Sequence, residues 1–178
     1  MSVMRLVGVF IIQCVAMLIV PSAAIATKFS LNQDTPSGSY SWWRGEDLKS
    51  TGSLSANVTV NKLREDDKWA PWVGFQLRSS SAPEDAIDIK FVFSVKTQAA
   101  AAAEITATEK GKKVDTLEIP GNFAVNQPFD VTIVWSIDGV NIKIGGVPEH
   151  KVPMPFVPAQ MRIWSGTADV TIANVELQ

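Results

Sequence analysis

Cysteine and histidine are almost absent: this chain of 178 residues contains one of each. Cys14 lies within residues 1–26, so the rest of the chain has no thiol nucleophile, no disulfide and no zinc–thiolate site. His150 stands in a proline-rich stretch, without the nearby nucleophile and orienting carboxylate that a catalytic base requires. We therefore predict no catalytic residue, no metal site and no cofactor.

A strong charge of one sign is also missing. Lys and Arg total 16, Asp and Glu total 18, and the formal net charge is −2. This balance argues against a nucleic-acid-binding protein. The acids Glu65, Asp66 and Asp67 lack the spacing of a calcium-binding loop, so a solvated turn is favoured over a calcium site. Asn57 and Thr59 complete an N-glycosylation acceptor, which falls in the middle of an expected strand.

One long apolar run is present, at residues 6–20. It is shorter than the roughly 20 residues of a membrane span. Arg5 precedes the run, and Ala24 and Ala26 give the small-x-small pattern of a signal peptidase site. The sequence therefore predicts a signal peptide at residues 1–26, cleavage after Ala26, and a secreted or periplasmic domain at residues 27–178 with no membrane attachment.

After residue 27 no sustained helical period occurs, and apolar residues instead alternate with polar ones. Such strands, each with one apolar face, predict an all-β fold of two antiparallel sheets packed face to face. Asp138 and Gly139 form the strongest hairpin signal. The expected strands are residues 54–60, 72–78, 87–95, 104–109, 114–119, 129–137, 140–144, 161–165 and 170–177.

Two stretches depart from this pattern. The alanine run 99–103 is too short to sustain a helix alone, and we expect a loop or one short turn there. Pro148, Pro153, Pro155 and Pro158 predict an extended connection that crosses from the hairpin to the last two strands.

Residues 129–146, FDVTIVWSIDGVNIKIGG, resemble a hairpin of the concanavalin A-like lectin/glucanase superfamily. Residues 170–177 are similar to the closing strand of laminin-G-like sandwiches of that group. The resemblance implies a single jelly-roll β-sandwich over residues 27–178. It also implies that glycans lie on the concave face of the jelly roll.

The resemblance also tests for hydrolase chemistry. Laminarinase-like members carry a strand with alternating carboxylates, which act as nucleophile and acid/base. Here residues 86–91 read AIDIKF, so Ala86 stands at the nucleophile position and Lys90 at the acid position. Only Asp88 of that strand matches. The alternative is a hydrolase or lyase with a shifted active site that uses Asp88, Glu46 or Asp47.

The six tryptophans are the most informative residues. Trp135 lies on the apolar register of its strand and is expected in the core. Trp72 lies on the polar register with Gln76 and Arg78, so we expect its indole to be exposed beside polar groups, as suits a sugar ring. The opposing interpretation is that the tryptophans cover the edge of the sandwich or pack under the proline-rich connection. The predicted binding residues are Trp43, Trp69, Trp72, Gln76, Arg78, Asp88 and Lys90.

Together these features predict an exported, non-catalytic, lectin-like domain that binds carbohydrate or polysaccharide. A structural or interaction module of the cell envelope is the third possibility, and it would present a broad, shallow apolar patch instead of a cleft.

Overall fold

The computed structural model describes residues 27–45, 47–79 and 81–178. The predicted signal peptide and Glu46 lie outside this part of the chain. Within it, no helix is long and apolar enough to cross a membrane.

The described residues form twelve strands. In chain order they are β1 (Thr27–Asp34), β2 (Tyr40–Gly45), β3 (Gly52–Leu63), β4 (Trp72–Ser79), β5 (Ala86–Val92), β6 (Ala99–Glu109), β7 (Lys112–Ala124), β8 (Phe129–Ser136), β9 (Gly139–Ile144), β10 (His150–Val152), β11 (Pro158–Gly166) and β12 (Ala168–Leu177).

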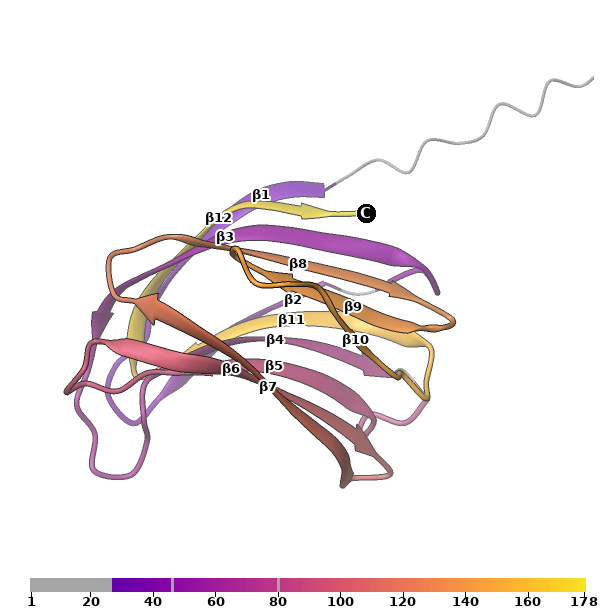
Figure 1. Cartoon of the computed structure of the whole chain (residues 1–178), viewed down its shortest axis with the longest axis horizontal. Coiled ribbons are helices and arrows are strands. Elements are labelled where there is room, and N and C mark those ends of the chain that lie inside the picture. Colours follow the sequence, from indigo (N-terminus) through magenta and orange to yellow (C-terminus); the bar gives the residue numbers. More distant parts are fainter. Residues whose placement is uncertain (1–26, 46, 80) are drawn as a thin grey trace, which may run out of the picture.

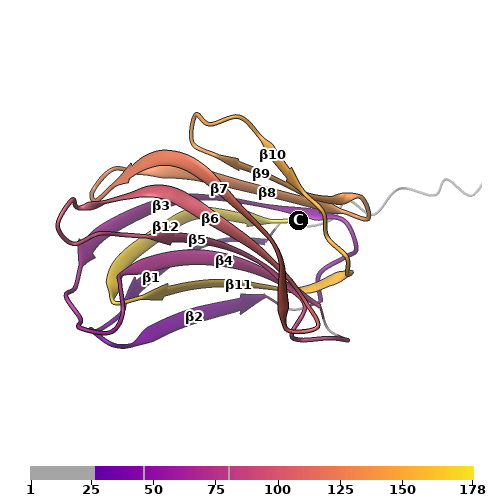
Figure 2. The same cartoon turned by 60° about the horizontal axis from the view of Figure 1, so that its bottom comes forward.

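These strands make two six-stranded antiparallel sheets, with the orders β1-β12-β3-β8-β9-β10 and β2-β11-β4-β5-β6-β7. Figure 1 shows the two layers arching in the same direction, with the strand ends bent toward the side of the second sheet. Figure 2 turns that side forward. We call the outward face of the second sheet the concave face, and the outward face of the first sheet the convex face.

The core lies between the sheets and is built from the apolar register of each strand. Phe75, Phe91 and Ile133 are almost completely buried there. Trp135 is also buried, and its Nε1 donates a hydrogen bond to the Lys49 carbonyl at 3.0 Å. The two-sheet prediction and the core position of Trp135 are confirmed.

The expected loop at residues 99–103 is wrong, because this run begins β6. It pairs with β7, with Ala99 opposite Ala124 and Ala103 opposite Ile119. A register shift between Ala100 and Ala102 lets both Ala100 and Ala103 point into the core, where they are fully buried. Packing therefore overrides the helical preference of alanine.

The proline-rich connection is more ordered than expected. His150–Val152 forms the short edge strand β10, and His150 pairs with Ile142 of β9. Pro158 begins β11 and pairs with Ser79 of β4. Between these two strands, residues 153–157 contain Pro153 and Pro155 and form no strand or helix, so the predicted connection is present there.

Candidate functional site

A polar row crosses four strands of the concave face. Gln76 of β4 lies between Asp88 of β5 and Arg162 of β11, and Arg162 lies beside Arg44 of β2. Because side chains alternate along each strand, the residues of this row point outward, whereas Phe75 and its neighbours in register point into the core from the other face of the sheet. Two residues further along, Arg78 follows Gln76 on the same side of β4.

An aromatic end adjoins the polar row. Trp164 of β11 pairs with Trp42 of β2, and two positions beyond them lie Tyr40 and Trp72. The rings of Trp72 and Trp164 pack edge to face with centroids 4.8 Å apart. The Lys90 ammonium lies 4.5 Å from the Trp72 ring centroid. We define the aromatic end as Tyr40, Trp42, Trp69, Trp72 and Trp164.

Two glycines make this packing feasible. A Cβ on Gly74 would lie 2.8 Å from the Ile89 carbonyl oxygen and 3.0 Å from Nε1 of Trp164. A Cβ on Gly166, which pairs with Trp72, would overlap the Trp72 indole. Each indole therefore lies across a glycine of the other strand, and both are fixed in place.

Trp72 differs from the expectation of an exposed indole. Only 9% of its surface is exposed, because Trp164, Gly166 and Lys90 enclose it. The accessible aromatic surface belongs instead to Tyr40 at 57%, Trp42 at 48% and Trp69 at 40% exposure.

A hollow of about 380 Å³ opens at the aromatic end. Tyr40 and Trp69 stack beside it with centroids 6.1 Å apart. Asp66 holds the Trp69 loop, since its Oδ1 accepts hydrogen bonds from the backbone N–H groups of Lys68 and Trp69, both at 2.9 Å. This part of the acidic stretch is thus a turn that positions an aromatic ring. The residues around the hollow are Tyr40, Lys68, Trp69, Ala70, Trp72, Lys90, Val92 and Trp164.

Trp43 does not share the concave face. It lies opposite Ile163 in register and packs on Phe29, with ring centroids 4.4 Å apart, so it points toward the sandwich interior. Its neighbour Trp42 takes the outward position. The alternation predicted one of the two on each side without deciding which. The prediction of Trp43 as a binding residue is wrong in this respect, because Trp42 and not Trp43 faces the concave side.

Sequence reasoning also missed Arg44 as a member of the site. A usable signal was present, because Arg44 shares its alternation with Trp42 just as Arg162 does with Trp164. The other predicted residues, Gln76, Arg78, Asp88 and Lys90, lie on the concave face as the alternation required.

Asp88 has an unusual environment for a carboxylate. Nε2 of Gln76 donates a hydrogen bond to its Oδ1 at 2.7 Å. Burial raises the pKa of Asp88, and the Gln76 hydrogen bond and the charges of Arg78, Lys90 and Arg162 only partly oppose that effect. Desolvation therefore outweighs the attraction of the surrounding cations.

Hydrolysis of the laminarinase type needs two converging carboxyl groups. On β5, Ala86 and Lys90 flank Asp88. Another acid of this face, Glu104 of β6, lies opposite Lys90 and pairs with Lys113, whose Nζ is 3.2 Å from Oε1. This set offers a partly buried Asp88 amid cations and a Glu104 that is already paired with Lys113, an arrangement that suits holding a ligand better than acid–base exchange. Asp47, which the alternative hydrolase hypothesis placed in a shifted active site, lies in the loop after β2. Its backbone is left-handed, with a φ of 59°.

Several buried polar atoms of the concave face have no partner in the described structure. They are Oε1 of Gln76, Nε of Arg78 and Nε of Arg162. Unmet buried donors and acceptors are costly, so a bound polar ligand would stabilise them.

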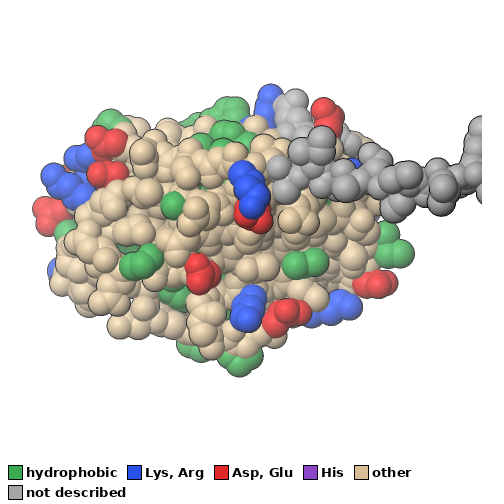
Figure 3. Space-filling model, turned by 90° about the horizontal axis from the view of Figure 1, so that it is seen from above, with side chains coloured by type: hydrophobic (Ala, Val, Ile, Leu, Met, Phe, Trp, Pro, Cys, Tyr) green, Lys and Arg blue, Asp and Glu red, His purple; other side chains and the backbone are tan. Residues whose placement is uncertain are grey.

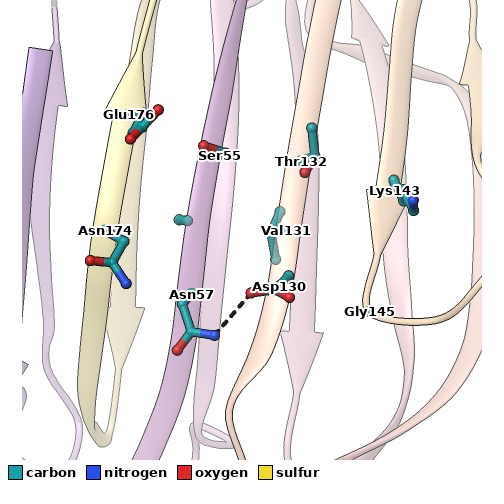
Figure 4. Close-up of a pocket in the computed structure, with 10 residues that line it drawn as sticks. Ser55, Asn57, Asp130, Val131, Thr132, Lys143, Gly145, Asn174 and Glu176 are labelled. Atoms are coloured by element: carbon teal, nitrogen blue, oxygen red, sulfur yellow. Dashed lines mark hydrogen bonds between the residues drawn. The ribbon is translucent and has the colours of Figure 1, made fainter. Parts of the chain in front are cut away.

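The convex face carries a different hollow, of about 500 Å³. Figure 3 shows charged side chains scattered over that face, and Figure 4 shows the hollow itself. Asn57, the possible glycosylation acceptor, donates a hydrogen bond to Asp130 at 2.9 Å. The described residues that line this convex-face hollow include no aromatic ring, so the hollow lacks the flat apolar surface on which a sugar stacks. We therefore place the candidate site on the concave face.

Among the described residues there is also no cluster of three or more metal-binding side chains.

No protein-family model matches the sequence, and no curated protein sequence matches it. Solved structures do. A galectin from Caenorhabditis elegans has a TM-score of 0.55 and 15% identity, over 82% of this chain and 94% of the galectin. A carbohydrate-binding module from Bacillus subtilis has a TM-score of 0.52 and 14% identity, over 84% of this chain and 92% of the module. A glycosidic hydrolase has a TM-score of 0.59 and 13% identity, over 85% of this chain and 77% of that structure.

The fold is a concanavalin A-like jelly roll. The predicted superfamily likeness is confirmed at the level of the fold, since identities this low carry nothing further. Function has to be argued from the concave face of this chain.

Proposed function

We propose that this chain is a non-catalytic, lectin-like domain that binds carbohydrate on its concave face. The observation that carries the proposal is the pairing of exposed aromatic rings with a polar row whose buried atoms lack partners. An indole or phenol ring stacks on the apolar face of a sugar, while guanidinium and amide groups bind its hydroxyls.

The neighbouring folds support this proposal. A galectin and a carbohydrate-binding module share the jelly roll, and the latter is named for binding carbohydrate. Export belongs to the same proposal, because the apolar run at residues 6–20 and the Ala24-x-Ala26 pattern suit a secreted or periplasmic protein.

A glycan-array screen of residues 27–178 tests the proposal. Binding to a saccharide, confirmed by titration and weakened in Trp42→Ala, is the expected result. The matched control is Trp135→Phe, which changes a tryptophan of the core away from this face. No binding to any glycan would overturn the proposal and favour the envelope-interaction alternative.

A further inference from the structure

Positive charge is concentrated on the concave face. Arg44, Arg78, Arg162 and Lys90 all point outward there around the carboxyl group of Asp88, while Glu104, the other acid of this face named above, is paired with Lys113. The chain as a whole carries a formal charge of −2, so this excess is local to the face.

The arginines crowd one another. Burial lowers the pKa of Arg162, and the nearby charges of Arg78 and Arg44 lower it further, while Asp88 acts in the opposite sense. Arginine nevertheless stays protonated at neutral pH, so the repulsion persists in the empty site. Asp88 cannot neutralise three guanidinium groups, and an additional anion would relieve the repulsion among them.

The guanidinium groups are also held in place. Arg44 and Arg162 both lie over the Trp42 ring, 5.6 Å and 5.4 Å from its centroid. Arg78 donates from Nη2 to the Pro83 carbonyl, which anchors its outer end. The Nε groups of Arg78 and Arg162 remain buried without an acceptor. Planar guanidinium donors fixed in this way match the oxygens of a carboxylate or sulfate.

We propose that the concave face selects an anionic saccharide, with the carboxylate or sulfate group bound by Arg162 between Arg44 and Arg78 and a sugar ring on Trp42. This inference rests on the proposed function and narrows its ligand class. A neutral glycan would leave the crowded cations unbalanced and the two buried Nε donors with weaker acceptors.

Titration of the purified chain with matched polymer pairs tests the inference. One pair is polygalacturonate and its methyl-esterified form, and the other is dextran sulfate and dextran. We expect at least one charged polymer to bind about tenfold or more tightly than its neutral partner, with an affinity that falls as salt rises. The pair that shows the preference identifies the acidic group as carboxylate or sulfate.

Two variants test the location of the anion. Arg162→Gln should reduce the preference for the charged polymer about tenfold or more. If that variant folds poorly, Arg44→Gln replaces it, because Arg44 is exposed and the same reduction is expected. Lys143→Gln is the matched control, because it removes one exposed positive charge from the convex face. It should leave the preference unchanged.

The outcomes separate this inference from the proposed function. Equal binding of charged and neutral partners overturns the anion preference and leaves carbohydrate binding intact, whereas failure of all four polymers together with a blank glycan array overturns both. A preference that persists in both arginine variants, or that Lys143→Gln abolishes equally, overturns the assigned location. Equally tight binding of a single-stranded oligonucleotide overturns selectivity for a saccharide.

Discussion

Replacing Trp42 by alanine is expected to weaken saccharide binding while leaving the fold nearly as stable as before. The indole is 48% exposed, and the guanidinium groups of Arg44 and Arg162 lie over its ring. Exposed cation–π contacts are worth about 0.5–1 kcal/mol each, so we expect a stability loss of no more than about 1–2 kcal/mol. An exposed aromatic anchor typically contributes about 1–3 kcal/mol to binding, which corresponds to roughly a 5- to 150-fold loss of affinity.

Trp72→Ala is the matched comparison, because it removes an indole from the same face that is only 9% exposed. Large-to-small changes at buried aromatic positions cost about 3–5 kcal/mol. For a domain of this size each kcal/mol lowers Tm by about 2–4 °C, so the melting temperature should fall by roughly 6–20 °C.

Thermal melts measure the stability loss of both variants, and calorimetric titrations measure their loss of saccharide affinity. Trp42→Ala with wild-type affinity would show that the exposed indole does not contact the ligand. Trp72→Ala with a wild-type Tm would refute the enclosed position of that ring.

Further predictions concern stability, acidity and processing. Burial raises the pKa of Asp88 above its ordinary 3.8, so folding favours the protonated form and the wild type loses stability as pH rises from about 4 through the raised pKa. Asp88→Asn should remove this loss and unfold at higher urea than the wild type at pH 7, but not at pH 3; the opposite order at pH 7 would contradict desolvation as the dominant effect. Gly74→Ala should cost about 1–3 kcal/mol, because its Cβ meets the Ile89 carbonyl, and chemical denaturation measures the loss. Phe75→Ala should cost about 3–5 kcal/mol through a core cavity, and a wild-type unfolding midpoint would argue against that. Intact-mass analysis of exported material should show a chain that starts at Thr27, and a mass that retains residues 1–26 would rule out the predicted cleavage.

The arrangement of strands was predictable because alternation is a local signal with a direct physical cause. Ile87, Ile89 and Phe91 alternate with Asp88 and Lys90, and the sheet buries the first set and exposes the second to the concave side. The same rule placed Gln76 and Arg78 correctly. The residue type and the alternating position along the strand were sufficient to predict these orientations.

What could not be predicted depends on contacts between distant strands. Whether Trp72 is exposed depends on Trp164 and Gly166, which follow it by some ninety residues and meet it only when β11 pairs with β4. Trp42 and Trp43 are chemically identical neighbours, and their opposite directions follow from how β2 pairs with β11. The alanines of β6 are a similar case, because their small size matters only against the opposing core.

The interlocked indoles of Trp72 and Trp164 have a consequence for how this face would recognise a ligand. Each ring lies across a glycine of the opposite strand, so neither has rotamers left to lose when a complex forms. Immobilising a mobile side chain costs about 0.5–1.5 kcal/mol on association, and these two rings avoid that cost. The entropy lost on complex formation should therefore come from the exposed side chains of Tyr40 and Trp42. Side-chain relaxation measurements should find these groups slowed by ligand and the two interlocked rings unchanged.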